Sequence, residues 1–170
     1  MIWEVDEHDQ ERVLHPQSDL RKHMFLHRAA LVIPQTGEGT FLVSKRAKDK
    51  LPFPGTWCCA VGGKVQAGES YQDAARREMK EEIGREEELE EVCSFLYNRP
   101  EYQAHFTIFT TKKKVDPATF QSDPREIECL RAFSLEHLQE SIVEHPAQFA
   151  PTFREALKMV IKTLHQKEKP

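Results

Sequence analysis

One segment, residues 70–83, constrains the fold of this chain more than any other, because both of its ends are marked in the sequence. Ser70 and Asp73 have the spacing of a capping box, in which each side chain bonds a backbone N–H at the start of a helix. Gly84 follows as a C-terminal stop, since glycine readily adopts the left-handed conformation that ends many helices. We therefore predict an α-helix over residues 70–83.

This predicted helix carries an unusual stripe of negative charge. At roughly 100° per residue, Glu78, Glu81 and Glu82 fall within one arc of the helix surface. Like charges three and four residues apart repel one another. The adjoining sector is apolar and can pack inward; it contains Ala75, Met79 and Ile83. The pattern indicates an amphipathic helix whose carboxylates face a positively charged group.

A divalent cation is the group that best fits this stripe. Mg²⁺ and Mn²⁺ are hard cations that prefer oxygen ligands and would remove the repulsion. Arg77 lies one turn before Glu81 and can orient a carboxylate that the metal does not occupy. An ordinary solvated helix face is the competing interpretation of the same glutamates.

The segment before the helix, GGKVQAGES, favours the metal interpretation. Paired glycines let the backbone turn sharply and approach a ligand closely. Residues 63–85 resemble the Nudix box, whose pattern is G-x5-E-x7-R-E-U-x-E-E-x-G-U, where U is a bulky aliphatic residue. Only Arg85 departs from the pattern, and the matching residues are Gly63, Glu69, Arg77, Glu78, Met79, Glu81, Glu82 and Gly84.

The resemblance implies an α/β Nudix fold, with a mixed β-sheet sandwiched between helices, over a single domain of residues 1–170. It also implies Mg²⁺-dependent hydrolysis of a diphosphate bond in a nucleoside diphosphate linked to another moiety, with Mn²⁺ as a substitute. Carried over by position, Glu78 and Glu82 are the main metal ligands, and the Gly62 carbonyl completes the metal shell. Glu81 is a further ligand or the base that activates water, Arg77 holds the carboxylates, and Glu69 supports the loop.

Further site residues are expected outside the box. Many members of the family use one more acidic residue from a later loop, for which Glu126, Glu128 and Glu101 are candidates. A diphosphate also needs cationic side chains beyond the metal, and an aromatic ring can stack on a base. The candidates for these contacts are Arg28, Lys45, Arg46 and Lys64 for the phosphates, and Trp57, Phe53 and Tyr102 for stacking.

Outside the box, the chain resembles the branch nearest to isopentenyl-diphosphate isomerase, which makes isomerisation an alternative reaction. That enzyme needs a cysteine five residues after the tryptophan and a histidine two residues further on. Counting from Trp57, these positions hold Gly62 and Lys64, while Cys58 and Cys59 come too early. His27 matches a metal-binding histidine of the isomerase but lacks its partners. A non-catalytic nucleotide-binding Nudix module is the other alternative.

Composition excludes several classes of protein. A net charge of −4 gives no reason to expect binding of a nucleic-acid polymer. No apolar run is long enough to cross a membrane, and the acidic N-terminus does not resemble a secretory signal. The four cysteines show no CxxC pair, which favours reduced thiols over a disulfide framework or zinc site. We expect a cytoplasmic protein with a small-molecule substrate, and a homodimer is one expected state.

The remaining pattern predicts strands early in the chain and helices at its end. Residues 24–33 and 40–46 flank a turn-forming cluster and predict a β-hairpin. Further strands are predicted at 57–61, 91–97, 104–111 and 127–133, and helices at 134–144 and 151–166. This order favours a mixed α/β layered domain.

Overall fold

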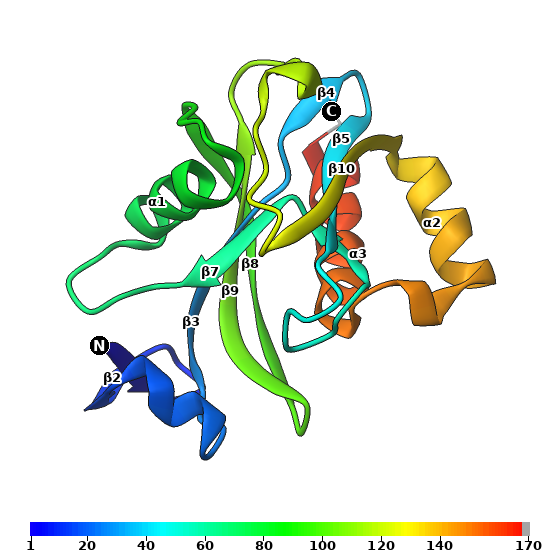
Figure 1. The fold of residues 1–170 in the computed structure, drawn as a ribbon. Helices are drawn as coiled ribbons and strands as arrows, with labels where there is room; N and C mark the ends of the chain where they lie inside the picture. The colour runs from blue at the N-terminus through cyan, green and yellow to red at the C-terminus, as the bar shows by residue number, and fades with distance from the viewer. Residues whose placement is uncertain (168–170) are drawn as a thin grey trace.

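The computed structural model describes residues 1–167, which form two β-sheets and three α-helices (Figure 1). The larger sheet has the strand order β2-β1-β3-β9-β8, and β7 pairs with β3 outside this path. Its strands are β1 (Ile2–Val5), β2 (Glu11–His15), β3 (His27–Val32), β7 (Val61–Lys64), β8 (Leu89–Arg99) and β9 (Tyr102–Thr111).

The smaller sheet has the order β10-β5-β4, and β6 pairs with β5. Its strands are β4 (Gln35–Gly37), β5 (Thr40–Arg46), β6 (Trp57–Cys59) and β10 (Ile127–Ser134). The helices are α1 (Tyr71–Ile83), α2 (Leu135–Glu144) and α3 (Pro151–Lys167). Within residues 1–167, none of the helices has the length and apolar character needed to span a membrane.

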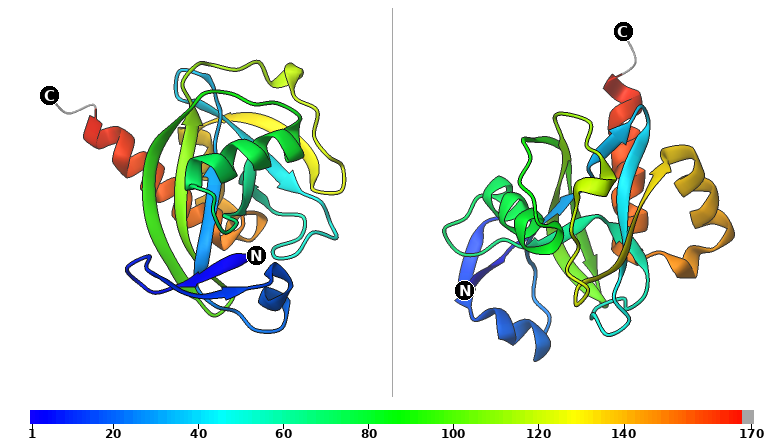
Figure 2. Two further views of the ribbon diagram at one scale, coloured as in Figure 1. Left: turned by 90° about the vertical axis from the view of Figure 1, so that its left-hand side faces the viewer. Right: turned by 45° about the horizontal axis from the view of Figure 1, so that its top comes forward.

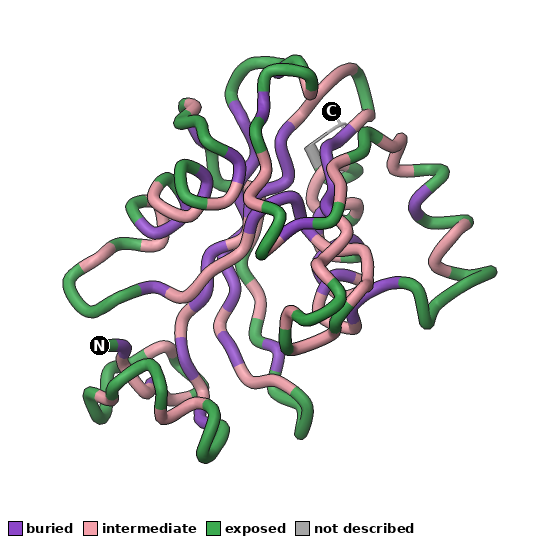
Figure 3. The backbone as a smooth tube through the Cα atoms, viewed as in Figure 1, coloured by how far each residue is buried: buried purple, intermediate pink, exposed green. Residues whose placement is uncertain are grey.

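Two helices cover opposite faces of the larger sheet (Figure 2). α1 buries Ala75, Met79 and Ile83 against the face that carries Val32 and Phe109. α3 packs against the other face, and its buried residues belong to a second core that also contains residues of the smaller sheet. Figure 3 shows the buried residues concentrated where the sheets and these two helices meet. The predicted α/β sandwich is confirmed.

The predicted helix over residues 70–83 is confirmed together with its capping. Ser70 accepts a hydrogen bond from the backbone N–H of Asp73, and the Asp73 carboxylate accepts one from the Ser70 N–H. Gly84 adopts a left-handed conformation with φ of 74°. The helices predicted at the end of the chain are also present, as are strands at 91–97, 104–111 and 127–133.

The predicted hairpin between residues 24–33 and 40–46 is wrong. β3 pairs in parallel with β9 in the larger sheet, whereas β5 belongs to the smaller one. Pro34 separates them, and proline cannot donate a ladder hydrogen bond. β4 instead forms the short hairpin with β5. The strand predicted over 57–61 is likewise divided at Ala60 between β6 of the smaller sheet and β7 of the larger sheet.

Candidate active site

The site begins where β7 passes beneath α1. A Cβ atom added to Gly63 would lie 1.9 Å from Cδ of Glu78, so a side chain at residue 63 would force this carboxylate out of its position. At Gly62, an added Cβ would lie 2.8 Å from the Leu31 side chain. The glycine pair therefore brings the strand backbone directly against the carboxylates of α1.

Arg77 connects these carboxylates to the loop that precedes the helix. Its Nε and Nη2 donate to the two carboxylate oxygens of Glu69 at 2.7 and 3.0 Å, and Nη2 also donates to the Lys64 carbonyl at 3.0 Å. Nη1 donates to Oε1 of Glu78 at 2.6 Å and lies 3.5 Å from Glu81. Hydrogen bonds from Arg77 hold the pKa of Glu69 below its usual value. One guanidinium therefore orients three carboxylates.

Glu78 and Glu82 are the carboxylates that the fold removes from water. Burial, reinforced by the nearby charge of Glu78, raises the pKa of Glu82 to about 8, although the Gly62 N–H donates to Glu82 Oε2 at 3.2 Å. Burial also raises the pKa of Glu78, and Arg77 opposes that shift. Glu81 is more exposed, at 59% of its side chain. The site thus contains two partly buried carboxylates that repel each other and one that is exposed to water.

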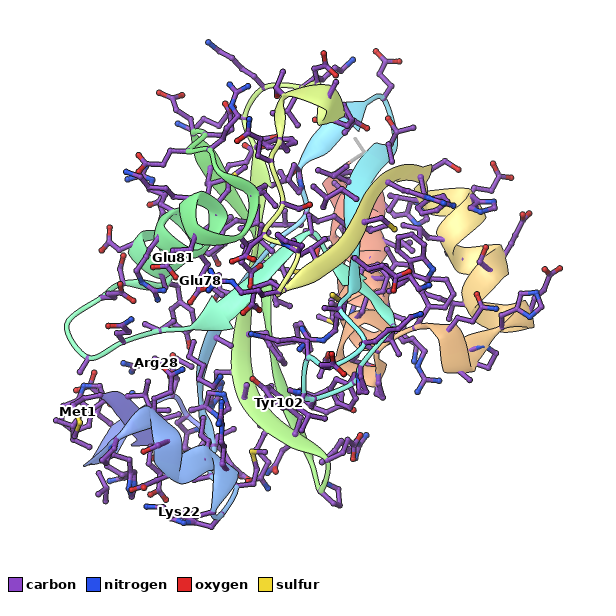
Figure 4. The ribbon with its side chains drawn as sticks, viewed as in Figure 1. Met1, Lys22, Arg28, Glu78, Glu81 and Tyr102 are labelled. Atoms are coloured by element: carbon purple, nitrogen blue, oxygen red, sulfur yellow. The ribbon has the colours of Figure 1, made fainter. Side chains whose placement is uncertain are left out.

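These residues line a cavity of about 570 Å³ between the two sheets. Figure 4 shows Glu78 and Glu81 on α1 and Tyr102 at the start of β9, on elements that border this cavity. The box residues Gly62, Gly63, Arg77, Glu78, Glu81 and Glu82 all contribute to its lining. Glu69 does not line the cavity and acts on it through Arg77.

Two cationic side chains in the lining have no acidic partner. Lys64 and Arg46 both reach the cavity, and neither forms an ion pair within residues 1–167. Nε of Arg46 is buried without a hydrogen-bond partner in that part of the chain, while its Nη2 donates to the carbonyls of Lys50 and Leu51. Burial lowers the pKa of Lys64, and Glu78 opposes the shift. Such cations suit an anionic ligand.

Of the candidate acidic residues in the later loops, one lines the cavity and two do not. Glu126 lines the cavity and forms an ion pair with Lys50. Its loop is fixed to α1, since the backbone N–H of Asp123 donates to the Glu82 carbonyl at 2.9 Å. Glu128 instead pairs with Lys45 at 3.1 Å, and neither residue lines the cavity. Glu101 accepts a hydrogen bond from Tyr97 and also lies outside the lining.

Besides Lys45, two of the predicted substrate contacts do not reach the cavity. Arg28 projects from the α1 face of β3 and bonds Asp9 and Glu11, both at 2.7 Å, whereas its neighbour Ala29 projects into the lining. Figure 4 shows Arg28 near the N-terminal strands. Trp57 packs edge-on against Phe133 with 5.4 Å between ring centroids.

Other lining residues escaped the sequence reasoning. Lys50, Asp123 and Arg125 line the cavity, but isolated charged residues give no signal in the sequence that they share a cavity. Cys58 and Cys59 also line the cavity, although they come too early in the sequence to match the cysteine of the isomerase. Burial raises the pKa of both thiols, which keeps them protonated at neutral pH. For the two cysteines, the pairing of β6 with β5 decides this position, and the sequence does not reveal that pairing.

The donor set is chemically suited to a hard divalent cation. It offers carboxylate oxygens from one helix and backbone carbonyls from a glycine pair that leaves no side chain in the way. Within residues 1–167, no three carboxylate, imidazole or thiol groups already stand in a metal-binding arrangement. Glu78 is bonded to Arg77 instead, so cation binding would require that hydrogen bond to be exchanged.

Comparison with known proteins first identifies the fold. A crystal structure of the DR0079 protein from Deinococcus radiodurans superposes with a TM-score of 0.79 at 21% identity, covering 92% of this chain and 96% of that one. The family model of the NUDIX domain matches residues 25–153. The chain therefore belongs to the Nudix family, whose hydrolases act on small-molecule diphosphates and generally use a divalent metal.

Two relatives extend this comparison. An uncharacterized Nudix hydrolase of Pseudomonas aeruginosa is 34% identical over 111 residues, which cover 65% of each chain and thus less than two thirds of the relative's length. A prenyl-diphosphate phosphatase of Methanosarcina mazei is 29% identical over 163 residues, which cover 95% of each chain.

Proposed function

We propose that this protein is a Mg²⁺-dependent hydrolase that cleaves the diphosphate bond of a small organic diphosphate. The observation that carries the proposal is the pairing of two partly buried, mutually repelling carboxylates, Glu78 and Glu82, with two cations that have no acidic partner, Arg46 and Lys64, in one cavity. A divalent cation stabilises the first pair, and the phosphate oxygens stabilise the second.

Glu78 and Glu82 would hold the cation, with the Gly62 carbonyl completing its shell. When bound, the ion neutralises the diphosphate oxygens and lowers the pKa of a coordinated water, and Mn²⁺ can substitute for Mg²⁺. Arg77 keeps the carboxylates in position through its bonds to Glu69 and Glu78. Removing the ion should therefore abolish turnover without unfolding the helix.

The chain's own groups perform the remaining tasks. Arg46 and Lys64 bind the phosphates and orient the bridging P–O bond. The oxygen of water forms a new bond to phosphorus, the bridging bond breaks, and the departing phosphate carries away its electron pair. The more exposed Glu81 accepts the proton from water, and Glu126 is the favoured additional acidic residue because it lines the cavity.

Two classes of substrate are supported, one by the Nudix box and the other by a relative. The resemblance of the box favours a nucleoside diphosphate linked to another moiety. The Methanosarcina relative, which aligns over 95% of this chain, is a prenyl-diphosphate phosphatase and favours a prenyl diphosphate. Both contain the same diphosphate and require the same cleavage, so the proposed reaction does not depend on the choice.

Release of phosphate or monophosphate from a panel of both classes, with millimolar Mg²⁺, tests the proposal. Glu82→Gln should reduce turnover by at least a hundredfold while its circular dichroism spectrum stays unchanged. Glu126→Gln should reduce turnover, whereas Glu128→Gln, two residues further on in β10 and outside the cavity, should not. Absence of turnover throughout the panel would refute hydrolysis and favour a binding module. Conversion of isopentenyl diphosphate to its isomer would favour the isomerase alternative.

A further inference from the structure

The cavity has an apolar wall that the proposed hydrolysis does not use. Phe53, Tyr102 and Phe106 form a continuous aromatic surface along it. The ring centroids of Phe53 and Tyr102 are 6.4 Å apart, and those of Tyr102 and Phe106 are 5.9 Å apart with nearly parallel planes. Ala29 and Leu31, which project from β3 toward the same side, extend this surface.

The hydroxyl of Tyr102 is already committed within the wall. His27 is buried, and its Nδ1 lies 3.1 Å from the Phe25 carbonyl, an atom that can only accept. Nδ1 therefore carries the proton, and Nε2 is left to accept the hydrogen bond from the Tyr102 hydroxyl at 3.2 Å. Tyr102 consequently has no proton to donate to a ligand.

The Ser44 hydroxyl is committed in the same way, because it donates to the Cys59 carbonyl at 2.8 Å. Gln17 and Thr152 are other polar side chains in the lining that could meet an organic group. A nucleobase carries several ring and exocyclic atoms that lose their bonds to water on burial, and each one left unpaired weakens binding. The aromatic wall offers a ring surface but few free donors for such atoms.

Arg46 lies at the junction of the two parts of the cavity. Its Nη2 donates to the carbonyls of Lys50 and Leu51, in the loop that carries Phe53, while Lys64 follows Gly63, whose backbone lies directly against Glu78. A diphosphate bound by Arg46 and Lys64 would therefore have the carboxylates of α1 on one side and the aromatic wall on the other. The group esterified to the diphosphate would extend along that wall.

We infer that the substrate is the diphosphate ester of an apolar alcohol, such as an isoprenoid alcohol, whose hydrocarbon chain packs against Phe53, Tyr102 and Phe106. This inference rests on the proposed function and specifies the organic part of its substrate. Burial of the hydrocarbon supplies binding free energy that grows with chain length. The wall therefore makes hydrocarbon length the main determinant of specificity.

A chain-length series tests the inference. The kcat/KM for phosphate release should rise at least tenfold from dimethylallyl diphosphate to geranyl diphosphate, with ATP and UDP-glucose as nucleotide comparisons. A nucleotide hydrolysed faster than geranyl diphosphate would overturn the inference and leave hydrolysis standing. An equal kcat/KM for both prenyl compounds would overturn it as well. Failure to hydrolyse any of these diphosphates would refute both the inference and the proposed function.

Two variants separate the apolar wall from polar contacts. Phe53 belongs to a partly exposed loop, so Phe53→Ala should fold normally. It should raise the KM for geranyl diphosphate about tenfold while leaving kcat and the KM for dimethylallyl diphosphate within about threefold. Thr152→Val, which keeps the side-chain shape, should change neither parameter. An increased KM in Thr152→Val with no effect in Phe53→Ala would show a polar organic group and overturn the inference.

Discussion

The close approach of Gly63 to Glu78 leads to a prediction that separates catalysis from folding. In Gly63→Ala, the new Cβ would lie 1.9 Å from Cδ and 2.1 Å from Oε1 of Glu78. Carbon atoms in contact normally stay about 3.5–4.0 Å apart. The carboxylate of Glu78 must therefore move by about 1.5–2 Å.

The two consequences of this displacement differ in size. The atoms that clash belong to the end of a flexible side chain, so the fold can adapt at a cost of about 1–3 kcal/mol, as for other overpacked sites. Catalysis is less tolerant, because a misplacement of about 1 Å can cost about a hundredfold in rate. Gly63→Ala should therefore remain folded and lose at least about a hundredfold in kcat/KM.

Phosphate release and thermal unfolding of the same preparations measure these effects. Gly37→Ala is the matched control, because its Cβ would lie 2.5 Å from Oγ1 of Thr40, in a hairpin that does not line the cavity. It should lose stability to a similar degree and retain full activity. Near-normal turnover in Gly63→Ala would refute the role assigned to Glu78, and unfolding of that variant would refute the argument from side-chain flexibility.

Three further predictions concern charge and protonation. Burial lowers the pKa of His27 to about 4, below the value of about 6.5 expected in the unfolded chain. The unfolded state therefore binds a proton first as the pH falls, and the free energy of unfolding should decrease by about 3 kcal/mol between pH 6.5 and 4. Urea titrations at several pH values should show that the free energy of unfolding of His27→Gln depends less on pH than that of the wild type. An equal pH dependence in the two proteins would contradict this. Arg77→Lys cannot reproduce the forked contact with Glu69, so kcat/KM should fall at least tenfold at saturating Mg²⁺, and unchanged kinetics would argue against the positioning role. Millimolar Mg²⁺ should raise the melting temperature of the wild type, whereas the double variant Glu78→Gln/Glu82→Gln should lose most of that gain, and an equal gain would place the ion elsewhere.

Local signals were sufficient to predict the charged half of the site. The capping box, the glycine stop and the glutamate spacing all lie within residues 70–84, where a helix fixes the relative positions of its own side chains. The same geometry places Glu78 and Glu81 beside Arg77. The assignment of these residues to metal binding stays a prediction, since it concerns a ligand and not the helix.

Pairing between strands far apart in the chain determines the features of the fold and the cavity that the sequence could not predict. The hairpin prediction failed because β3 pairs with β9, which lies much later in the chain, with His27 opposite Ala104. The same register decides which basic residues reach the cavity. Lys64 is paired with Ala29, and both side chains lie on the cavity face of the sheet. Arg28 directly precedes Ala29 in β3, so its side chain points to the opposite face. Candidates such as Arg28 and Lys64 look alike in the sequence because both are basic residues beside apolar strands.

The short segment 57–64 explains how the two halves of the cavity come together. It begins as β6 in the smaller sheet and continues as β7 in the larger one, with buried Ala60 at the transition. Before the transition it contributes Cys58 and Cys59 to the lining, and after it Gly62 and Gly63 approach the carboxylates of α1. A single extended strand would have kept all of these residues in one sheet. The change of sheet therefore lets one continuous stretch line the cavity from both sheets.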